Sequence, residues 1–320
     1  MIEALHTALS AAALPAGATR LFHGRGGLHP GCEHLTLDWY PPCFLLTSFE
    51  QALGEAELAA VHELLAARYA DWAPGQALNW LYQGREVGGD ERPTTRLMAG
   101  AVPEPHGVEE QGARYQVHLQ RGQNHGLFLD MAEGRRWVRA FCAERPGARV
   151  LNLFAYSCAF SVAALQGGAR DVVNVDMSPG ALALGRRNHE LNGLPIVGQR
   201  GASQGASFLA HDLFKSWGKL TRSGPYELVI ADPPSYQKGS FVATKDYARL
   251  ARRLPELLSP GGAALVCLNS PKLGPDWLQQ LMAEQAPTLQ FMQRLPNPPA
   301  FADVDAARAL KVLEYRRSAA

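Results

Sequence analysis

Residues 150–176 read VLNLFAYSCAFSVAALQGGARDVVNVD. An apolar run at Val150–Phe154 is followed by a helical pattern over Ala159–Gln166 and a second apolar run at Asp171–Val175. Both runs are too continuously apolar to have a face in water, which is typical of parallel strands covered on both sides. The stretch therefore predicts a strand–helix–strand unit of a doubly wound α/β sheet.

The same alternation continues on both sides of this unit. Upstream, two short strands and a helix are expected at Gln116–Gln120, Gly126–Leu129 and Glu133–Glu144. Downstream, the pattern predicts helices at Pro179–Asn192, Leu213–Leu220, Thr244–Leu258 and Asp276–Glu284, and strands at Phe208–His211, Glu227–Ala231, Ala263–Leu268 and Leu310–Tyr315. We therefore expect residues 111–320 to form a Rossmann-like α/β domain, with its ligands at the carboxyl ends of the strands.

Residues 1–110 have a different pattern, which predicts a smaller α+β domain. A helix is expected at the start, and a long one over Phe49–Trp72 with Ser48 as its cap. Strands are expected at Ala77–Gln83 and Arg96–Ala101, around a polar turn at Gly88–Arg92. No catalytic signature occurs in this part, and only domain order suggests a role in substrate binding.

Charge and composition narrow the classes of partner. The 320 residues include 31 Lys and Arg against 30 Asp and Glu, and 47% are hydrophobic, which is enough for a large core. Because the formal net charge is +1, a nucleic acid would have to be bound by a local basic patch. Candidates are Arg114, Arg121, Arg135, Arg136, Arg139, Lys238 and Lys245. Such charges are also typical of an ordinary solvated face.

The cysteines and histidines predict no metal site. Five cysteines occur without a CxxC pair, and the ten histidines show no metal-ligand spacing. We interpret the cysteines as reduced thiols of a cytoplasmic protein. The first residues lack the basic segment and long apolar run of a signal peptide, and no stretch approaches the length of a membrane span.

Three carboxylates follow successive predicted strands: Asp176, Asp212 and Asp232. In a doubly wound sheet these positions converge on one crevice, and an acid about 20 residues after the first strand can bind the hydroxyls of a ribose. Each could instead cap the helix that follows it. The three together, with the segment DPPSY beginning at Asp232, favour a binding site.

The first strand-to-helix turn, NLFAYSCAFS, contains no glycine. It lacks the GxGxxG that brings a backbone close to a pyrophosphate, which disfavours NAD or FAD. S-adenosylmethionine, which contains an adenosine but no phosphate, suits this turn better. In DPPSY, Pro233 and Pro234 predict a rigid bend whose carbonyls accept hydrogen bonds from a flat, amino-bearing acceptor, and Tyr236 offers a stacking face. A simple turn at the end of a strand is the alternative.

Residues 115–316 resemble class I S-adenosylmethionine-dependent methyltransferases. They are most similar to a family of large-subunit ribosomal RNA methyltransferases that includes the K half of the bifunctional K/L enzyme and the cytosine-5 enzyme RlmI. The segments that match are GLFLD (126–130), VLNLFAYSCAFSVAALQGGA (150–169), VDMS (175–178), RNHELNGL (187–194), YELVIADPPSY (226–236) and ALKVLEYR (309–316).

The resemblance implies roles for individual residues. It implies that the cofactor is bound by Phe128, Asp130, Arg135, Asn152, Phe154, Ala155, Asp176, Met177, Asp212 and Leu213. Within this set, Asn152, Phe154 and Ala155 would line the methionine side. Asp176 would bind the ribose, Met177 would contact the adenine, and Asp212 with Leu213 would hold the adenine amino edge.

The resemblance further implies that Asp232, Pro233 and Pro234 lie between the methyl group and its acceptor. The chain departs from the family at Cys158, where the first turn usually has glycine, and this puts in doubt how closely the backbone approaches the methionine carboxylate.

The acceptor atom can be argued in part. Cytosine C5 is a poor nucleophile, so its methylation needs a cysteine thiolate to add at C6 first. The cytosine-5 relatives carry that cysteine after the strand corresponding to Ala263–Leu268, where this chain has Asn269; Cys267 lies inside the strand. With Ser235 after the double proline, a nitrogen of a ribosomal RNA base is the favoured acceptor. A protein or small-molecule acceptor, and a binding protein without turnover, are the alternatives.

Overall fold

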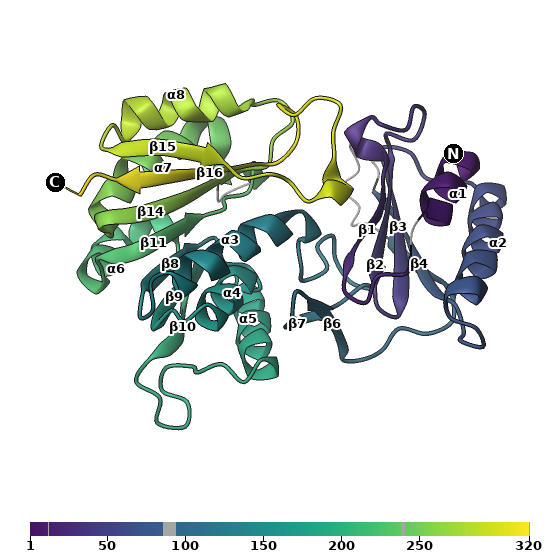
Figure 1. Ribbon diagram of the computed structural model, residues 1–320, viewed down its shortest axis with the longest axis horizontal. Coiled ribbons are helices and arrows are strands. Elements are labelled where there is room, and N and C mark those ends of the chain that lie inside the picture. Colours follow the sequence, from purple (N-terminus) through teal and green to yellow (C-terminus); the bar gives the residue numbers. More distant parts are fainter. Residues whose placement is uncertain (12, 86–93, 238–240, 320) are drawn as a thin grey trace. The chain divides into compact units, whose positions relative to one another are not determined.

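The computed structural model describes residues 1–11, 13–85, 94–237 and 241–319, and the side chains of residues 236 and 237 lie outside this description. The chain divides into two compact units (Figure 1). Unit 1 comprises Met1–Leu129 with Pro298–Ala306, and unit 2 comprises Asp130–Asn297 with Ala307–Ala320.

Unit 1 is built on a five-stranded sheet of order β1-β2-β3-β4-β5. Neighbouring strands are antiparallel except β3 and β4, which are joined through helix α2 and run parallel. Its elements are α1 (Ile2–Ala11), β1 (Thr19–His23), η1 (Gly24–Gly26), β2 (Leu35–Tyr40), β3 (Cys43–Phe49), α2 (Glu55–Trp72), β4 (Asn79–Arg85), β5 (Thr94–Ala99), β6 (His106–Glu110), β7 (Ala113–Val117) and η4 (Pro299–Phe301).

Unit 2 is a seven-stranded sheet of order β10-β9-β8-β11-β14-β16-β15. Its elements begin with η2 (Leu129–Met131), which spans the unit boundary, and continue with α3 (Ala132–Ala143), β8 (Arg149–Leu153), α4 (Ala159–Gln166), β9 (Asp171–Asp176), α5 (Pro179–Leu191), β10 (Gly205–Ala210), η3 (Leu213–Lys215), α6 (Trp217–Ser223), β11 (Tyr226–Ala231), β12 (Tyr236–Gln237), β13 (Phe241–Val242), α7 (Ala243–Leu257), β14 (Leu258–Leu268), α8 (Pro275–Gln285), β15 (Leu289–Arg294) and β16 (Lys311–Arg317).

The strand order of unit 2 confirms the predicted doubly wound sheet. Strands β8, β9, β10, β11 and β14 run parallel, and β16 is antiparallel to β14. The order reverses between β8 and β11, so the loops that follow these two strands leave the sheet in opposite directions and open a crevice. The first turn and the Asp232 segment both belong to these loops.

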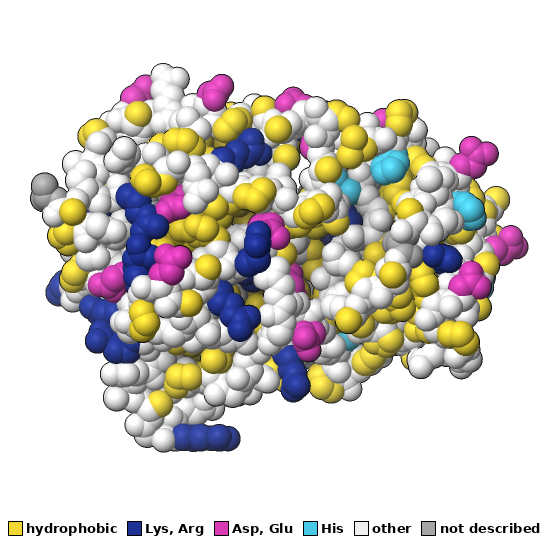
Figure 2. All heavy atoms as spheres, in the orientation of Figure 1, with side chains coloured by type: hydrophobic (Ala, Val, Ile, Leu, Met, Phe, Trp, Pro, Cys, Tyr) yellow, Lys and Arg dark blue, Asp and Glu magenta, His cyan; other side chains and the backbone are white. Residues whose placement is uncertain are grey.

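Charged side chains of both signs are interspersed on the face shown in Figure 2, with hydrophobic side chains between them. This agrees with the nearly equal numbers of basic and acidic residues in the chain.

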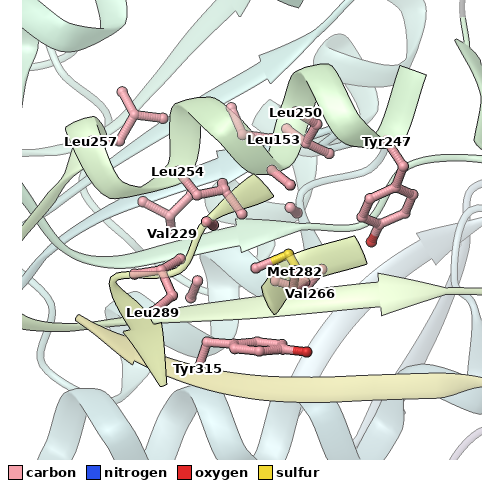
Figure 3. Packing of buried hydrophobic residues seen from close by; sticks show 14 of the residues in the cluster. Leu153, Val229, Tyr247, Leu250, Leu254, Leu257, Val266, Met282, Leu289 and Tyr315 are labelled. Atoms are coloured by element: carbon pink, nitrogen blue, oxygen red, sulfur yellow. The ribbon is translucent and has the colours of Figure 1, made fainter. Parts of the chain in front are cut away.

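Two hydrophobic layers cover the sheet of unit 2. One layer packs α3 and α4 onto one face, and the other packs α6, α7 and α8 onto the opposite face. Figure 3 shows the second layer, in which Tyr247, Leu250, Leu254 and Leu257 project from α7 onto the strands. Their spacing of three and four residues is the period of a helix with one buried face. Burying each leucine stabilises the fold by roughly 1.5–3 kcal/mol.

Several local predictions differ from the structure. Gly126–Leu129 is not a strand: residues 126–128 are loop, and Leu129 is the first residue of η2. Ser48 is not a helix cap, since it is buried within β3 and α2 begins after Gly54. The strand β15 was not anticipated. The division expected between residues 110 and 111 falls between β6 and β7, which pair as a hairpin within unit 1. The predicted turn at Gly88–Arg92 lies outside the described residues.

Candidate active site

A hollow lies at the carboxyl ends of β8 and β9 and beside η3. Five of the residues predicted to bind a cofactor come together there, and three further residues complete its lining. The eight are Phe154, Val175, Asp176, Met177, His211, Asp212, Leu213 and Phe214. They come from three segments, which are the turn after β8, the end of β9 with the residue after it, and the stretch from the end of β10 into η3. The order of the strands explains why they meet.

The carboxylate of Asp176 is held by two backbone groups. It ends β9, and its Oδ2 accepts a hydrogen bond from the N–H of Tyr156 at 2.8 Å while Oδ1 accepts one from the N–H of Ser178 at 2.8 Å. A carboxylate has about four acceptor positions, so each oxygen keeps one. Asp176 is therefore fixed in place with capacity to accept two hydroxyl groups, such as those of a ribose.

The first turn adopts a left-handed backbone at three alternate residues. The φ angles are 56° at Phe154, 46° at Tyr156 and 59° at Cys158. Non-glycine residues in this region cost of order 1 kcal/mol each and persist only where their surroundings hold them. The hydrogen bonds from Tyr156 to Asp176 and from the N–H of Ala155 to the carbonyl of Val175, 3.0 Å long, tie this turn to the end of β9.

Cys158 takes the place of the expected glycine and packs against α5. It is buried, and a β-carbon built on Gly185 would lie only 2.4 Å from its Sγ. Burial, with the nearby carboxylate of Asp176 as a smaller cause, raises the pKa of the Cys158 thiol well above its usual value. Cys158 is therefore a protonated packing residue whose extra volume is accommodated by the missing side chain at position 185.

Asn152 begins a chain of buried hydrogen bonds. Its amide donates to Asn174 at 2.9 Å, Asn174 donates to the hydroxyl of Ser161 at 3.0 Å, and that hydroxyl lies 2.9 Å from Nε2 of His189. Nδ1 of His189 lies 2.7 Å from the carbonyl of Gly185, which can only accept. Nδ1 therefore donates and Nε2 accepts from Ser161. Burial lowers the pKa of His189 to about 4, so the ring is neutral.

Asn152 is thus a buried residue of β8, and it does not line the hollow. Ala155 is likewise buried, packed with Cys158 and Leu182. The predicted methionine-side residues thus divide between Phe154, which lines the hollow, and two residues that support the turn.

Asp212 is fixed at the start of η3. Its Oδ1 accepts from the N–H of Phe214 at 2.9 Å, and its Oδ2 lies 3.5 Å from Nζ of Lys215. Beside it, buried Leu213 and exposed Met177 supply apolar surface to the hollow. A carboxylate between apolar walls suits the amino edge and the flat faces of an adenine.

Asp232 follows β11 and is only partly exposed. Burial and, to a lesser extent, the carboxylate of Asp130 raise its pKa to about 7, and the guanidinium of Arg135 opposes this rise. The structure therefore brings Asp130, Arg135 and Asp232 into one electrostatic group. Near neutral pH, the Asp232 carboxyl can both release and accept a proton.

The segment after Asp232 is joined to the loop after β14. The hydroxyl of Ser235 donates to the carbonyl of Asn269, and Nζ of buried Lys311 donates to the carbonyl of Ser270. The carbonyl of Ser235 in turn accepts from the N–H of Ala243 at 3.1 Å. The rigid bend expected at Pro233 and Pro234 thus leads into a held segment; the predicted stacking by the Tyr236 side chain lies outside the described residues.

No reactive thiol lies at this segment. All five cysteines of the chain are buried and free. Cys267 is fully buried in β14, and burial, with the carboxylates of Asp232 and Asp130 nearby, raises the pKa of its thiol well above the usual value. Asn269, which is exposed, follows β14, where the resemblance to cytosine-5 enzymes implies a nucleophilic cysteine.

The remaining predicted residues fall on either side of the unit boundary. Asp130 is half-buried in η2, and Arg135 is 4% exposed in α3. Phe128 belongs to unit 1 and is 40% exposed. Within the described parts of the chain, no group of His, Cys, Asp and Glu is arranged to bind a metal ion. No helix there is long and apolar enough to cross a membrane.

Sequence reasoning missed His211 and Phe214, which flank the predicted pair Asp212 and Leu213. Their place next to a predicted binding residue was the available signal. It also missed Phe241. The centre of its ring lies 5.3 Å from the ring centre of Phe154 and 6.3 Å from that of Phe214. That contact joins segments distant in the sequence, so no local pattern could have indicated it.

Comparison with known proteins settles the family. Residues 19–316 match the family described as S-adenosylmethionine-dependent methyltransferase, which is nearly the whole chain. The chain belongs to this methyltransferase family. S-adenosylmethionine is therefore its cofactor, in agreement with the carboxylates and apolar walls of the hollow.

The methyltransferase is similar to proteins named ribosomal RNA large subunit methyltransferase I. It is 30% identical to the one from Aeromonas salmonicida over 261 residues, which is 80% of this chain and 62% of the relative. It is 29% identical to the one from Erwinia tasmaniensis over 310 residues, covering 94% of this chain and 69% of the relative. The chain thus spans just under two thirds of the length of the Aeromonas relative.

Solved structures share the fold. A SAM-dependent methyltransferase from Streptococcus mutans matches with a TM-score of 0.79 at 24% identity, covering 98% of this chain and 80% of that one. A methyltransferase complexed with SAH matches with a TM-score of 0.75 at 24% identity, covering 98% and 79%.

Proposed function

We propose that this methyltransferase transfers the methyl group of S-adenosylmethionine to a nitrogen of a base in large-subunit ribosomal RNA. The names of its curated relatives support ribosomal RNA as the substrate class. The proposed place of action is the cytoplasm, where the five free thiols would persist in reduced form.

The proposed cofactor site keeps the predicted residues with two kinds of role. Asp176, Asp212, Leu213, Met177 and Phe154 would contact the cofactor directly, since they line the hollow. Others would support the turn beside the methionine part of the cofactor or interact with the charged groups of that part. This second set is Phe128, Asp130, Arg135, Asn152 and Ala155.

The state of Cys267 carries the argument for nitrogen. Attack on cytosine C6 needs a thiolate, and a fully buried cysteine with a strongly raised pKa is not one at neutral pH. Asn269 at the corresponding loop position cannot form a covalent adduct with the base. A base nitrogen needs no such nucleophile, because its own lone pair can attack the methyl carbon.

The proposed reaction is a single in-line displacement. As the nitrogen–carbon bond forms, the carbon–sulfur bond breaks and its electron pair stays on sulfur. The bound cofactor supplies only a methyl group already activated by the sulfonium charge. The chain contributes alignment: the backbone carbonyls at Pro233 and Pro234 and the carboxylate of Asp232 would accept hydrogen bonds from the base amino group. Asp232, with a pKa of about 7, would accept the proton released from nitrogen.

The test is methyl transfer to deproteinised ribosomal RNA from a strain that lacks the gene. Purified protein and cofactor labelled in the methyl group should place label in large-subunit RNA, and RNA from the parent strain, already modified, should take up little. Absence of labelling by a protein that binds the cofactor would contradict the proposed substrate.

A further inference from the structure

A basic surface runs over η3, α6 and α7 of unit 2. We name as the basic strip the seven residues Lys215, Lys219, Arg222, Lys245, Arg249, Arg252 and Arg253. Residues 212–223 and 243–257, which comprise these elements and the N-cap of η3, contain only three carboxylates, those of Asp212, Asp246 and Glu256. The strip region thus carries a formal charge of +4 in a chain of net +1, so the rest of the chain carries −3.

The positions of these residues put them on one side of each helix. On α7, Lys245, Arg249 and Arg252 are spaced four and three residues apart and are exposed, while Tyr247, Leu250 and Leu254 face the core. Lys215, Lys219 and Arg222 repeat the spacing and are exposed as well. From Lys245 to Arg252 a helix rises about 10 Å.

Two arginine–aromatic contacts join the two halves of the strip. The guanidinium of Arg249 lies 4.3 Å from the ring centre of Phe214, and that of Arg253 lies 5.6 Å from the ring centre of Trp217. These contacts hold the α7 arginines against η3 and α6. Because Phe214 also lines the cofactor hollow, the strip begins at the rim of that hollow.

Most of the charge in the strip is not neutralised. Arg249, Arg253 and Lys215 pair with the three carboxylates at 3.3, 3.1 and 3.5 Å. Within the described residues, the other four bases, Lys219, Arg222, Lys245 and Arg252, have no carboxylate partner. An uncompensated surface of this kind favours a polyanion.

The basic patch expected from the sequence is largely a different set of residues from the basic strip. Arg135 is buried, Arg136 pairs with Glu133, and Lys238 lies outside the described residues. Arg114 and Arg121 belong to unit 1. Of the expected patch, Lys245 is the member that falls in the basic strip.

We propose that the basic strip binds the phosphate backbone of single-stranded RNA next to the acceptor base. Lys245 lies in the first turn of α7, directly after the β12–β13 hairpin that continues the Asp232 segment, so the strip joins both the acceptor segment and the cofactor hollow. Guanidinium planes held on aromatic rings suit nucleotides better than a flexible acidic peptide. This inference rests on the proposed function.

The test measures affinity for labelled oligouridine of about 20 nucleotides at salt concentrations from about 50 to 200 mM. The variant Arg222→Gln/Lys245→Gln/Arg252→Gln removes three unpaired charges of the strip. For single strands each phosphate contact contributes about 0.7 to the slope of log K against log salt, so the slope should fall in magnitude by about 2. S-adenosylmethionine should stabilise this variant against unfolding as much as it stabilises the parent protein.

The matched control is Arg187→Gln/Arg200→Gln/Arg308→Gln, which removes three exposed charges elsewhere in unit 2. It should leave the slope nearly unchanged. Equal loss in both triple variants, no RNA binding by the parent protein, or displacement of the RNA by polyglutamate as readily as by unlabelled RNA would overturn the proposal. Oligouridine binding needs no methyl transfer. RNA binding by the basic strip can therefore be confirmed even if ribosomal RNA proves not to be the substrate, and the failure of either proposal can be recognised separately.

Discussion

The Sγ of Cys158 fills the space that a side chain at position 185 would need: a β-carbon on Gly185 would lie 2.4 Å from that sulfur and 2.9 Å from the β-carbon of Cys158. The first cofactor turn and helix α5 are therefore matched through a cysteine on one side and a glycine on the other. The cysteine at position 158 is accommodated within the fold.

This contact predicts that Gly185→Ala is destabilising. Overpacking a core typically costs 1–3 kcal/mol, and urea unfolding should show a loss of about that size. Adding Cys158→Gly should recover most of it, since the clash disappears. Gly180→Ala on the same helix is the control: its β-carbon would meet only Oγ of Ser178 at 3.9 Å, and the substitution should be neutral or stabilising. Additive losses in the double variant would contradict this account.

The cofactor site predicts a selective effect of Asp176→Asn. The amide can accept with only one of its two atoms, so the hydrogen bonds to the ribose hydroxyls weaken, and affinity for S-adenosylhomocysteine measured by calorimetry should fall at least ~10-fold. Asp171→Asn, at the opposite end of β9, is the control and should bind normally. Equal affinities of the two variants would remove Asp176 from the site.

The Asp232 carboxyl predicts a pH dependence of activity. If its ionised form accepts hydrogen bonds and the released proton, the turnover rate should rise through about pH 7 and then level off. Asp232→Asn should be slower and lack that rise. If the turnover rate of the parent protein did not change between pH 6 and 8, on either side of this pKa, Asp232 would not be the proton acceptor.

The same group affects stability with a definite sign. Between its ordinary pKa of 3.8 and about 7, the folded chain holds a proton on Asp232 that the unfolded chain has released. The contribution of this group to the free energy of unfolding therefore falls as pH rises across that window. Asp232→Asn should gain stability relative to the parent over the same interval, and denaturant unfolding at several pH values measures the difference.

The sequence was most informative where strands are buried on both sides. The apolar runs at Val150–Phe154 and Asp171–Val175 correspond to β8 and β9, and the acids after strands were found because position along the chain identifies the carboxyl end. The edge strand β15 could not be predicted from the sequence, because most of its side chains are exposed and it has no apolar run. The strand predicted at Gly126–Leu129 was wrong because its apolar pattern comes from two buried leucines, Leu127 in a loop and Leu129 in η2.

The candidate site was predictable only in part for a related reason. Polar residues after strands could be named in advance. The left-handed backbone at Phe154, Tyr156 and Cys158 could not, because none of these residue types marks such a conformation. The contact between Phe154 and Phe241 depends on how distant segments pack, which no local pattern records.

The central claim, nitrogen methylation without a cysteine nucleophile, is tested most directly by identifying the methylated nucleoside. Large-subunit ribosomal RNA from a strain lacking the gene would be incubated with the protein and cofactor, digested and analysed by mass spectrometry, in parallel with the Cys267→Ala variant. The account predicts the same N-methylated nucleoside from both proteins. Formation of 5-methylcytidine by the parent protein, abolished in Cys267→Ala while its fold and cofactor binding persist, would contradict it.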